Sequence, residues 1–184
     1  MTKDQIVTLI NACRKNDRES QQALYRHFYN YGMTICMRYA GTREEAKEIL
    51  NDGFVKVFLK IDRYSPNLSF KGWLNKILVN TAIDHFRKFK NEPQTVDLIH
   101  AQHYEVESEA LHNLSVEAIF DLINKLPPAY RMAFNLYAVE GYKHSEIAEK
   151  LGISVGTSKS NLAKAKMKLK SMITKADDWR NVSG

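Results

Sequence analysis

The sequence predicts an all-α protein, with two small helical domains joined by an acidic linker and a helix-turn-helix in the C-terminal domain. Apolar residues recur at helical spacing along most of the chain. Glycine and proline number 8 and 4 among 184 residues, about half their usual share, which disfavours a turn-rich sandwich or barrel. The net charge divides into +7 over residues 1–90, −7 over 91–124 and +6 over 125–184. We therefore expect basic domains at 1–90 and 115–184 and an acidic linker at 91–114.

Two helices are expected before Gly41, separated by the polar pair Asn16 and Asp17. Their apolar residues follow one another at intervals of three and four, which places them on one face of each helix. These residues are Ile6, Leu9, Ile10 and Cys13 in the first helix, and Leu24, Phe28 and Tyr31 in the second.

A third helix is expected to begin at Thr42, because Thr42 and Glu45 have the spacing of a capping box. The tripeptide Asn51-Asp52-Gly53 resembles a turn, yet the apolar residues keep helical phase across it. We therefore predict a continuous helix with a glycine cost of about 1 kcal/mol. Its inward positions are Ile49, Phe54, Val57 and Ile61.

A loop over Ser65–Ser69 precedes a helix from Phe70 to about Lys90, which Ser69 can cap. Trp73 is in phase with the apolar side, so we expect it in the core, with stacking on a nucleic-acid base as the alternative. The apolar side carries Trp73, Leu74, Ile77, Ile83 and Phe86, and the other side carries Lys71, Lys76, Asn80, Asp84, Arg87 and Lys88.

The second helical unit is expected to begin at Ser115, after a stretch from Asn91 to Asn113 in which periodicity fades and acidic residues accumulate. Proline interrupts the helices of this unit at Pro127-Pro128, and Gly141 ends the segment that follows.

The segment after Gly141 predicts a helix-turn-helix. A helix with apolar Ile147, Ala148 and Leu151 ends at Gly152, and Ser154 can cap the next helix after a three-residue turn. The expected inward stripe of this second helix is Val155, Leu162, Ala165 and Leu169, with Ser158 also on that stripe and able to bond the carbonyl four residues back.

The side chains that point away from this stripe suit a DNA major groove. Lysine reaches guanine or phosphate, asparagine reaches adenine, and small residues allow close approach. A packing hairpin with a solvated basic face is the alternative. The outward residues are Ser160 and Lys164, flanked by Thr157, Asn161 and Ala163, with Lys159 and Lys166 at the edges.

Several other classes of protein are disfavoured. Charge-free stretches fall short of the roughly 18 apolar residues of a membrane helix, and the N-terminus lacks a secretory signal. Cys13 and Cys36 lack the spacing of a zinc site or disulfide scaffold. Phosphate-loop, zinc-protease and serine-hydrolase motifs are absent from the sequence, and the pair His100 and His103 has no further ligand nearby. We expect a cytoplasmic protein that is not an enzyme and binds no cofactor or metal.

The sequence resembles the extracytoplasmic-function (ECF) sigma factors of bacterial RNA polymerase, of the sigma-70 type. In the N-terminal half the resemblance rests on Ala46-Lys-Glu-Ile-Leu-Asn-Asp-Gly-Phe and on the stretch from Phe70 to Asp84. In the C-terminal half it rests on Leu126-Pro-Pro-Ala-Tyr-Arg-Met-Ala-Phe, Glu140-Gly-Tyr, Glu146-Ile-Ala-Glu and Gly152-Ile-Ser-Val-Gly-Thr.

The resemblance implies three contact surfaces. Polymerase binding falls to Glu48, Asn51 and Asp52. Melting and recognition of the minus-ten element fall to Ser65, Asn67, Ser69, Lys76, Asn80, Arg87 and Lys88, of which Lys76, Arg87 and Lys88 take phosphates. Recognition of the minus-thirty-five element falls to Thr157, Lys159, Ser160, Asn161, Ala163, Lys164 and Lys166.

The chain departs from the family pattern at three places. Asn51 and Asp52 stand where the family commonly has the longer Gln and Glu, Ser158 stands at a usually apolar position, and Asn161 replaces a frequent arginine. The implied function is a transcription initiation factor whose partners are core RNA polymerase (clamp helices and flap), promoter DNA and an anti-sigma factor. A stand-alone helix-turn-helix repressor or activator is the alternative.

Overall fold

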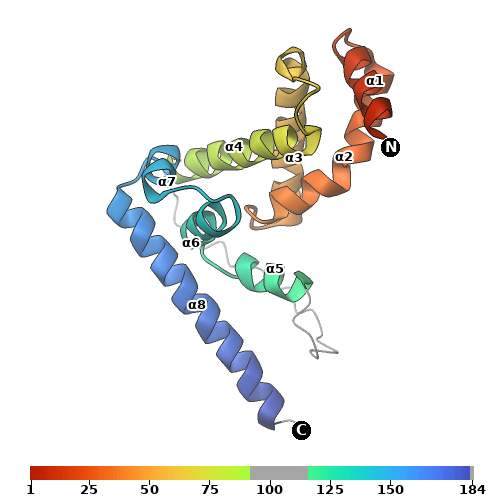
Figure 1. Ribbon diagram of the computed structural model, residues 1–184. Coiled ribbons are helices and arrows are strands. Elements are labelled where there is room, and N and C mark those ends of the chain that lie inside the picture. Colours follow the sequence, from red (N-terminus) through yellow and green to blue (C-terminus); the bar gives the residue numbers. More distant parts are fainter. Residues whose placement is uncertain (92–115, 183–184) are drawn as a thin grey trace. The chain divides into compact units, whose positions relative to one another are not determined.

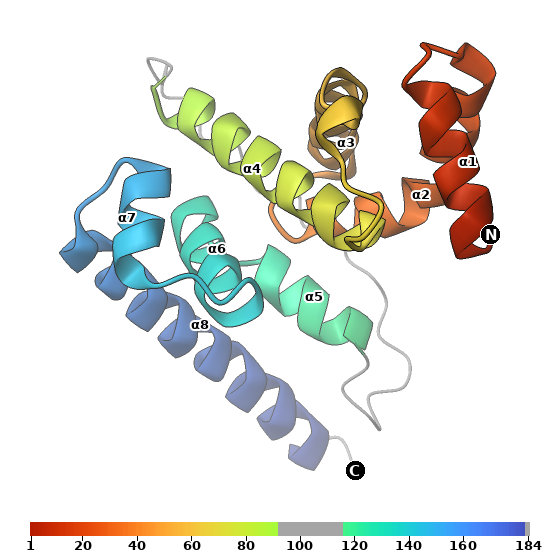
Figure 2. The same cartoon turned by 45° about the horizontal axis from the view of Figure 1, so that its top comes forward.

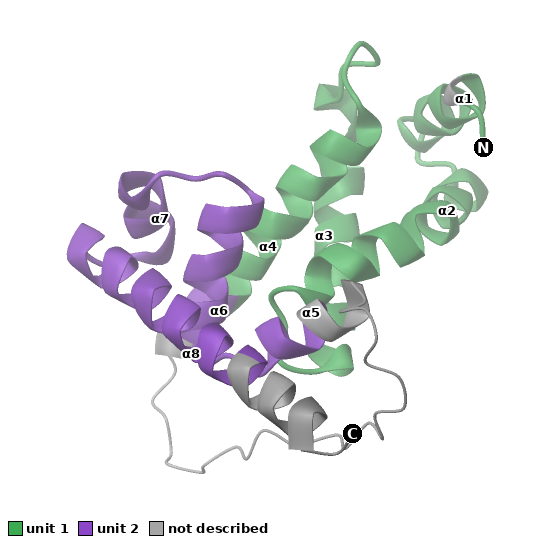
Figure 3. Ribbon diagram, turned by 60° about the horizontal axis from the view of Figure 1, so that its bottom comes forward, with its two compact units in different colours: residues 1–85 green, residues 86–184 purple. Residues whose placement is uncertain are grey.

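The computed structural model describes residues 1–91 and 116–182, and all regular structure in these ranges is helical (Figure 1). The chain divides into two compact units, Met1–His85 and Phe86–Gly184 (Figure 3). Most of the predicted acidic linker, with His100 and His103, lies outside the described residues. Among the helices that are described, none combines the length and apolarity needed to cross a membrane.

The first unit is a succession of helices in which α1 contacts α2 and α2 contacts α3 (Figure 2). A single 3-10 turn, η1, and a loop connect α3 to the long helix α4. The elements are α1 (Lys3–Cys13), α2 (Arg18–Met37), α3 (Arg43–Leu59), η1 (Ile61–Arg63) and α4 (Phe70–Asn91), the last of which crosses the division between the units.

The starts of these helices are fixed by local hydrogen bonds. The carboxylate of Asp17 accepts from the backbone N–H of Ser20, and the hydroxyl of Thr42 accepts from that of Glu45 at 3.1 Å. The carboxylate of Glu45 accepts from the N–H of Gly41 instead of that of Thr42, so only half of the predicted capping box forms.

Close helix packing explains why α3 carries a glycine. Helix α3 runs without interruption through Asn51-Asp52-Gly53, as predicted. A Cβ atom added at Gly53 would lie 2.4 Å from a methyl carbon of Leu78 on α4, and one added at Gly32 would lie 2.4 Å from a methyl carbon of Leu50. The glycines therefore let the helices approach, a benefit that offsets their propensity cost.

An aromatic cluster lies at the start of α4 in the first unit. The Phe70 ring centroid lies 4.8 Å from that of Phe28 and 5.4 Å from that of Tyr64. Trp73 packs at the edge of this cluster, 5.3 Å from Tyr64 and 5.7 Å from Phe70, and is half-buried. Its indole is thus partly in the core, as the helical phase predicted.

The second unit is a bundle of helices packed along α8. Helices α5, α6 and α7, labelled in Figure 1, all contact α8. Helix α6 continues directly into η2, which is one π-helical turn. Its elements are α5 (Val116–Asn124), α6 (Pro128–Phe134), η2 (Asn135–Val139), α7 (His144–Leu151) and α8 (Val155–Val182). Helices α6 and α7 and the π-helical turn η2 contribute buried apolar residues to the core of this unit, among them Met132, Leu136, Ile147 and Leu151.

The helix-turn-helix forms where the sequence predicts it. Gly152 adopts the left-handed conformation with φ +60°, and the Ser154 hydroxyl accepts from the N–H of Thr157 at 2.9 Å. The predicted inward stripe is wrong at Val155, which is 42% exposed. Val155 occupies the first turn of α8, where the buried part of the stripe has not yet begun, and Ser158 is the first buried residue.

Candidate nucleic-acid and protein interfaces

The second helix of the helix-turn-helix presents a polar, basic face. The residues expected to read DNA are all exposed except Asn161, which is half-buried. Ser160 and Lys164 point farthest from the buried Leu162 and Ala165, whereas Lys159 and Lys166 lie at the edges of the buried stripe. The exposed ones are Thr157, Lys159, Ser160, Ala163, Lys164 and Lys166.

Two of these lysines also lie near aromatic rings of the preceding helices. The Lys164 ammonium lies 6.0 Å from the centroid of the Tyr130 ring, and that of Lys166 lies 5.9 Å from the Tyr137 ring. Both separations are within reach of a weak cation–π attraction. Sequence reasoning missed these pairs because tyrosine and lysine come from different helices.

Ser158 has a different partner from the expected one. It is fully buried, and its hydroxyl oxygen lies 3.0 Å from Nδ1 of His144, the first residue of α7. The predicted bond to the carbonyl four residues back is therefore replaced by a contact between the two helices of the motif. The His144 ring also stacks on Tyr137, with centroids 4.8 Å apart.

The loop Ser65–Ser69, which is predicted to contact the minus-ten element, is exposed and connects η1 to α4. Ser65, Asn67 and Ser69 are exposed, and the N–H of Leu68 donates to the carbonyl of Ser65 at 3.0 Å. Sequence reasoning did not single out Leu68, which is 60% exposed. An exposed leucine in an otherwise polar loop has no periodic signal that would reveal it.

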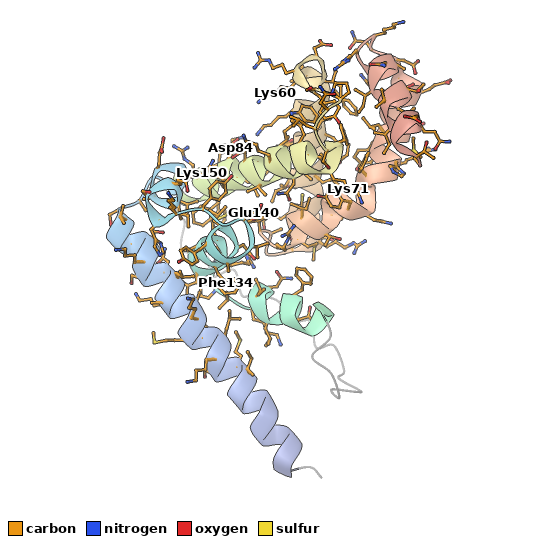
Figure 4. All side chains as sticks on the ribbon, viewed as in Figure 1. Lys60, Lys71, Asp84, Phe134, Glu140 and Lys150 are labelled. Carbon is orange, nitrogen blue, oxygen red and sulfur yellow. The ribbon has the colours of Figure 1, made fainter. Side chains whose placement is uncertain are left out.

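The polar side of α4 continues from this loop. Lys76, Arg87 and Lys88 are exposed, and Asn80 is half-buried. Asp84, labelled in Figure 4, forms an ion pair with Lys56 of α3 at 2.8 Å. Asp84 is thus part of a surface salt bridge between α3 and α4.

The residues predicted to bind polymerase lie together on α3. Glu48, Asn51 and Asp52 are exposed. Val55 and Leu59 extend the same face and are 58% and 78% exposed, although both are apolar. Glu48, Asp52, Val55 and Leu59 follow one another at intervals of four, three and four, so they form one stripe, which we call the α3 stripe.

Neighbouring helices hold two of the polar residues on this surface. The Tyr25 hydroxyl donates to Oδ1 of Asn51 at 2.9 Å, and Nε2 of His85 lies 2.8 Å from Oδ2 of Asp52. The partners come from α2 and α4, so the orientation of both side chains is set by tertiary packing.

The described residues contain no cluster of three or more side chains suited to hold a metal ion. Cys13 and Cys36 are buried free thiols. Burial raises the pKa of Cys13 to about 11 and that of Cys36 to about 12. Both thiols are thus protonated at neutral pH, which is unfavourable for metal ligation or nucleophilic chemistry.

Comparison with known proteins relates both units to one family. Residues 24–92 match the model of sigma-70 region 2, and residues 116–169 match that of sigma-70 region 4. The chain is 31% identical over 153 residues to the RNA polymerase sigma factor SigZ of Bacillus subtilis, covering 78% of this chain and 86% of that one. It is 25% identical over 177 residues to the ECF RNA polymerase sigma-E factor of Haemophilus influenzae, covering 90% and 93%.

A solved structure shares the fold. It is the sigma factor RpoE of Bartonella quintana in complex with the anti-sigma factor NepR, with a TM-score of 0.50 and 20% identity over 94% of this chain and 96% of that one. A two-unit helical chain with a helix-turn-helix and matches to both sigma regions defines a sigma factor. The chain belongs to the sigma-70 family, within its ECF group.

Proposed function

We propose that this protein is a transcription initiation factor, which binds core RNA polymerase and directs it to promoters through minus-ten and minus-thirty-five elements. The observation that carries this proposal is the match of the N-terminal unit to sigma-70 region 2 and of the C-terminal unit to region 4. A stand-alone repressor or activator is not favoured. Such a regulator would use its N-terminal half for ligand binding or dimerisation, whereas the N-terminal unit of this chain matches sigma-70 region 2.

The α3 stripe and Asn51 form the proposed polymerase contact. Its acidic part, Glu48 and Asp52, suits a basic partner surface, and the exposed Val55 and Leu59 supply apolar area that desolvates on binding. The shorter side chains of Asn51 and Asp52 are held by Tyr25 and His85, which supports a contact made with little reorganisation.

The loop Ser65–Ser69 and the polar side of α4 form the proposed minus-ten contact. Opening a duplex costs a few kcal/mol of unstacking per step, which capture of a displaced base can offset. The exposed Ser65, Asn67 and Ser69 offer hydrogen bonds to such a base, and Asn80 extends the same surface along α4. Lys76, Arg87 and Lys88 supply charge for the backbone of the separated strand.

The N-terminal half of α8 is the proposed reader of the minus-thirty-five element. Its exposed lysines and small residues fit the width and chemistry of a major groove. Each predicted part of the chain then has a proposed role. Residues 1–90 bind polymerase and the minus-ten element, residues 91–114 connect the two domains, and residues 115–184 read the upstream element.

The family also bears on partners and location. Sigma factors are not enzymes, and we expect no catalytic activity and no cofactor. The structural relative is bound to an anti-sigma factor, so we propose that this chain has such a partner too. Because the proposed function is carried out on promoter DNA, we propose that the protein acts in the cytoplasm.

Transcription in vitro tests the proposed function. Purified protein and core polymerase are incubated with a library of random promoters, and the transcripts are sequenced. We expect initiation that depends on the added protein and selects two sequence elements separated by a fixed spacer. Tight binding of the protein alone to a duplex operator, with no dependent transcript, would instead identify a stand-alone regulator.

Charge reversal tests the polymerase contact. The double variant Glu48→Lys and Asp52→Lys should abolish association with core polymerase while helicity is retained, because both acidic groups of the α3 stripe change sign. The matched control is Asp4→Lys with Glu19→Lys, which changes the charge of the same unit equally at exposed sites on α1 and α2. Retained binding by the α3 variant would assign the polymerase contact elsewhere.

A further inference from the structure

Arg14, which follows α1, connects that helix to a distant part of the first unit. It lies outside both family-model matches, which cover residues 24–92 and 116–169. Its Nη2 donates to the carbonyl of Tyr64 at 2.6 Å, and its Nε donates to the carbonyl of Ile61 at 3.5 Å. Its Nη1 donates to Oδ1 of Asn11 at 3.1 Å. All three guanidinium nitrogens therefore have an acceptor, and two of these acceptors are backbone groups of η1 and the residue after it.

Tyr64 carries this restraint into the loop Ser65–Ser69. Its hydroxyl donates to the carbonyl of Leu68 at 2.7 Å, and its ring packs on Phe70 and Trp73. Burial raises the pKa of the Tyr64 phenol, so the hydroxyl keeps the proton that it donates. The start of the loop is thus held through the Tyr64 carbonyl and its end through the Tyr64 hydroxyl.

The loop is restrained along its backbone while its side chains remain available. Leu68 is 60% exposed, and Asn67 beside it is exposed as well. Ordering a flexible backbone costs conformational entropy, and a loop that is already ordered does not incur this cost on binding. A restrained loop with an exposed leucine and asparagine is suited to take up an unstacked base.

We propose that Arg14 is a positioning residue for promoter melting, which holds the loop Ser65–Ser69 in the conformation that captures a base of the separated minus-ten strand. This inference rests on the proposed function. Arg14 acts through the loop and does not touch the DNA. Helix α1 then has a role in the unit beyond packing on α2, because Arg14, the residue at its C-terminal cap, fixes the loop.

The test uses the full chain assembled with core polymerase, and as probe the non-template minus-ten strand of a promoter selected from the random library. Arg14→Ala should bind this single-stranded oligonucleotide about tenfold more weakly, as expected for loss of charged hydrogen bonds. Arg14→Lys should show an intermediate loss, since one ammonium cannot replace the planar fork. Affinity for core polymerase and the salt dependence of oligonucleotide binding should stay at wild-type values.

Two controls separate the possible outcomes. Arg18→Ala removes the same charge at an exposed site at the start of α2, and Asn67→Ala with Leu68→Ala removes the loop side chains themselves. If the loop variant weakens binding but Arg14→Ala behaves like Arg18→Ala, the positioning role is wrong. If the loop variant binds as tightly as the wild type, both the minus-ten assignment of the loop and the positioning role of Arg14 are wrong.

Two further readouts would overturn the proposal in other ways. A weaker salt dependence in Arg14→Ala would mean that Arg14 contacts a phosphate directly. A parallel loss of polymerase affinity, with reduced helicity by circular dichroism, would mean that Arg14 only maintains the fold of the unit.

Discussion

Nδ1 of His144 lies 3.0 Å from the hydroxyl oxygen of Ser158, so a hydrogen bond joins the first turn of α7 to the buried side of α8. Ser158 has no exposed surface, and the His144 ring is held in turn by stacking on Tyr137. The bond lies where the two helices of the helix-turn-helix pack together. It therefore helps to fix the angle between α7 and α8, the helix that we propose reads DNA.

Replacing Ser158 with alanine tests this contact. We expect Ser158→Ala to destabilise the second unit by about 1 kcal/mol, because a buried hydrogen bond is lost while half-exposed His144 can recruit water. Amide hydrogen exchange over α7 and α8, read by mass spectrometry, measures this unit separately from the first. Ser160→Ala, at an exposed site on the same helix, is the control and should change exchange little. Equal protection in both variants would show that the bond contributes nothing.

Gly53→Ala tests the close approach of α3 and α4. The added methyl group would lie 2.4 Å from Leu78, so we expect a loss of about 1–3 kcal/mol in the free energy of unfolding despite the better helix propensity of alanine. Urea unfolding followed by tryptophan fluorescence measures it, in variants that also carry Trp179→Phe so that Trp73 is the fluorophore. Gly72→Ala, where the nearest atom is 3.8 Å away, should instead leave stability unchanged or raise it by up to about 1 kcal/mol. A stabilised Gly53→Ala would show that the helices can move apart at little cost.

Lys164→Ala tests the contact of α8 with DNA. If its ammonium neutralises one phosphate, the variant should bind the upstream element more weakly and its slope of log affinity against log salt should fall by about one. Fluorescence anisotropy of polymerase-bound protein on duplex DNA at several salt concentrations gives the slope. Lys168→Ala, farther along α8, provides a charge-matched comparison. An unchanged slope places Lys164 off the phosphate backbone.

The buried thiols predict a stability that depends on pH. Burial raises the pKa of Cys36 to about 12, whereas an unfolded thiol ionises near 9. Between these values the unfolded chain releases the proton that the folded chain keeps, so the free energy of unfolding falls as pH rises above about 9, by about 1 kcal/mol at pH 10. Comparing wild type with Cys36→Ala over this range isolates the effect. Parallel pH curves for the two proteins would contradict it.

Much of the fold follows from local sequence. The caps at Thr42 and Ser154 and the left-handed glycine at Gly152 use groups within a few residues of one another. The helical phase across Asn51-Asp52-Gly53 is also local, because a helix needs only its own backbone bonds. For the same reason, helical phase predicted that the proposed DNA-reading residues of α8 are exposed, and all of them except the half-buried Asn161 are.

The candidate surfaces were less accessible to sequence reasoning. The family resemblance assigned Glu48 and Asp52 to the polymerase contact but gave no reason to single out Val55 and Leu59, because an exposed apolar residue resembles a core residue until the neighbouring helices are placed. The inward assignment of Val155 failed for a related reason. Helical phase gives the direction of a side chain, whereas burial also requires another element to cover it.

The sequence by itself determined that the chain is helical, where several of its helices begin, and to which family it belongs, since propensity, capping and motif spacing are properties of neighbouring residues. Only the tertiary structure decided that Arg14 holds the carbonyl of Tyr64, 50 residues away, and that Ser158 binds His144 instead of its own helix. These contacts join side chains from separate elements. Their partners are chosen by which helices pack together, and no local pattern encodes that choice.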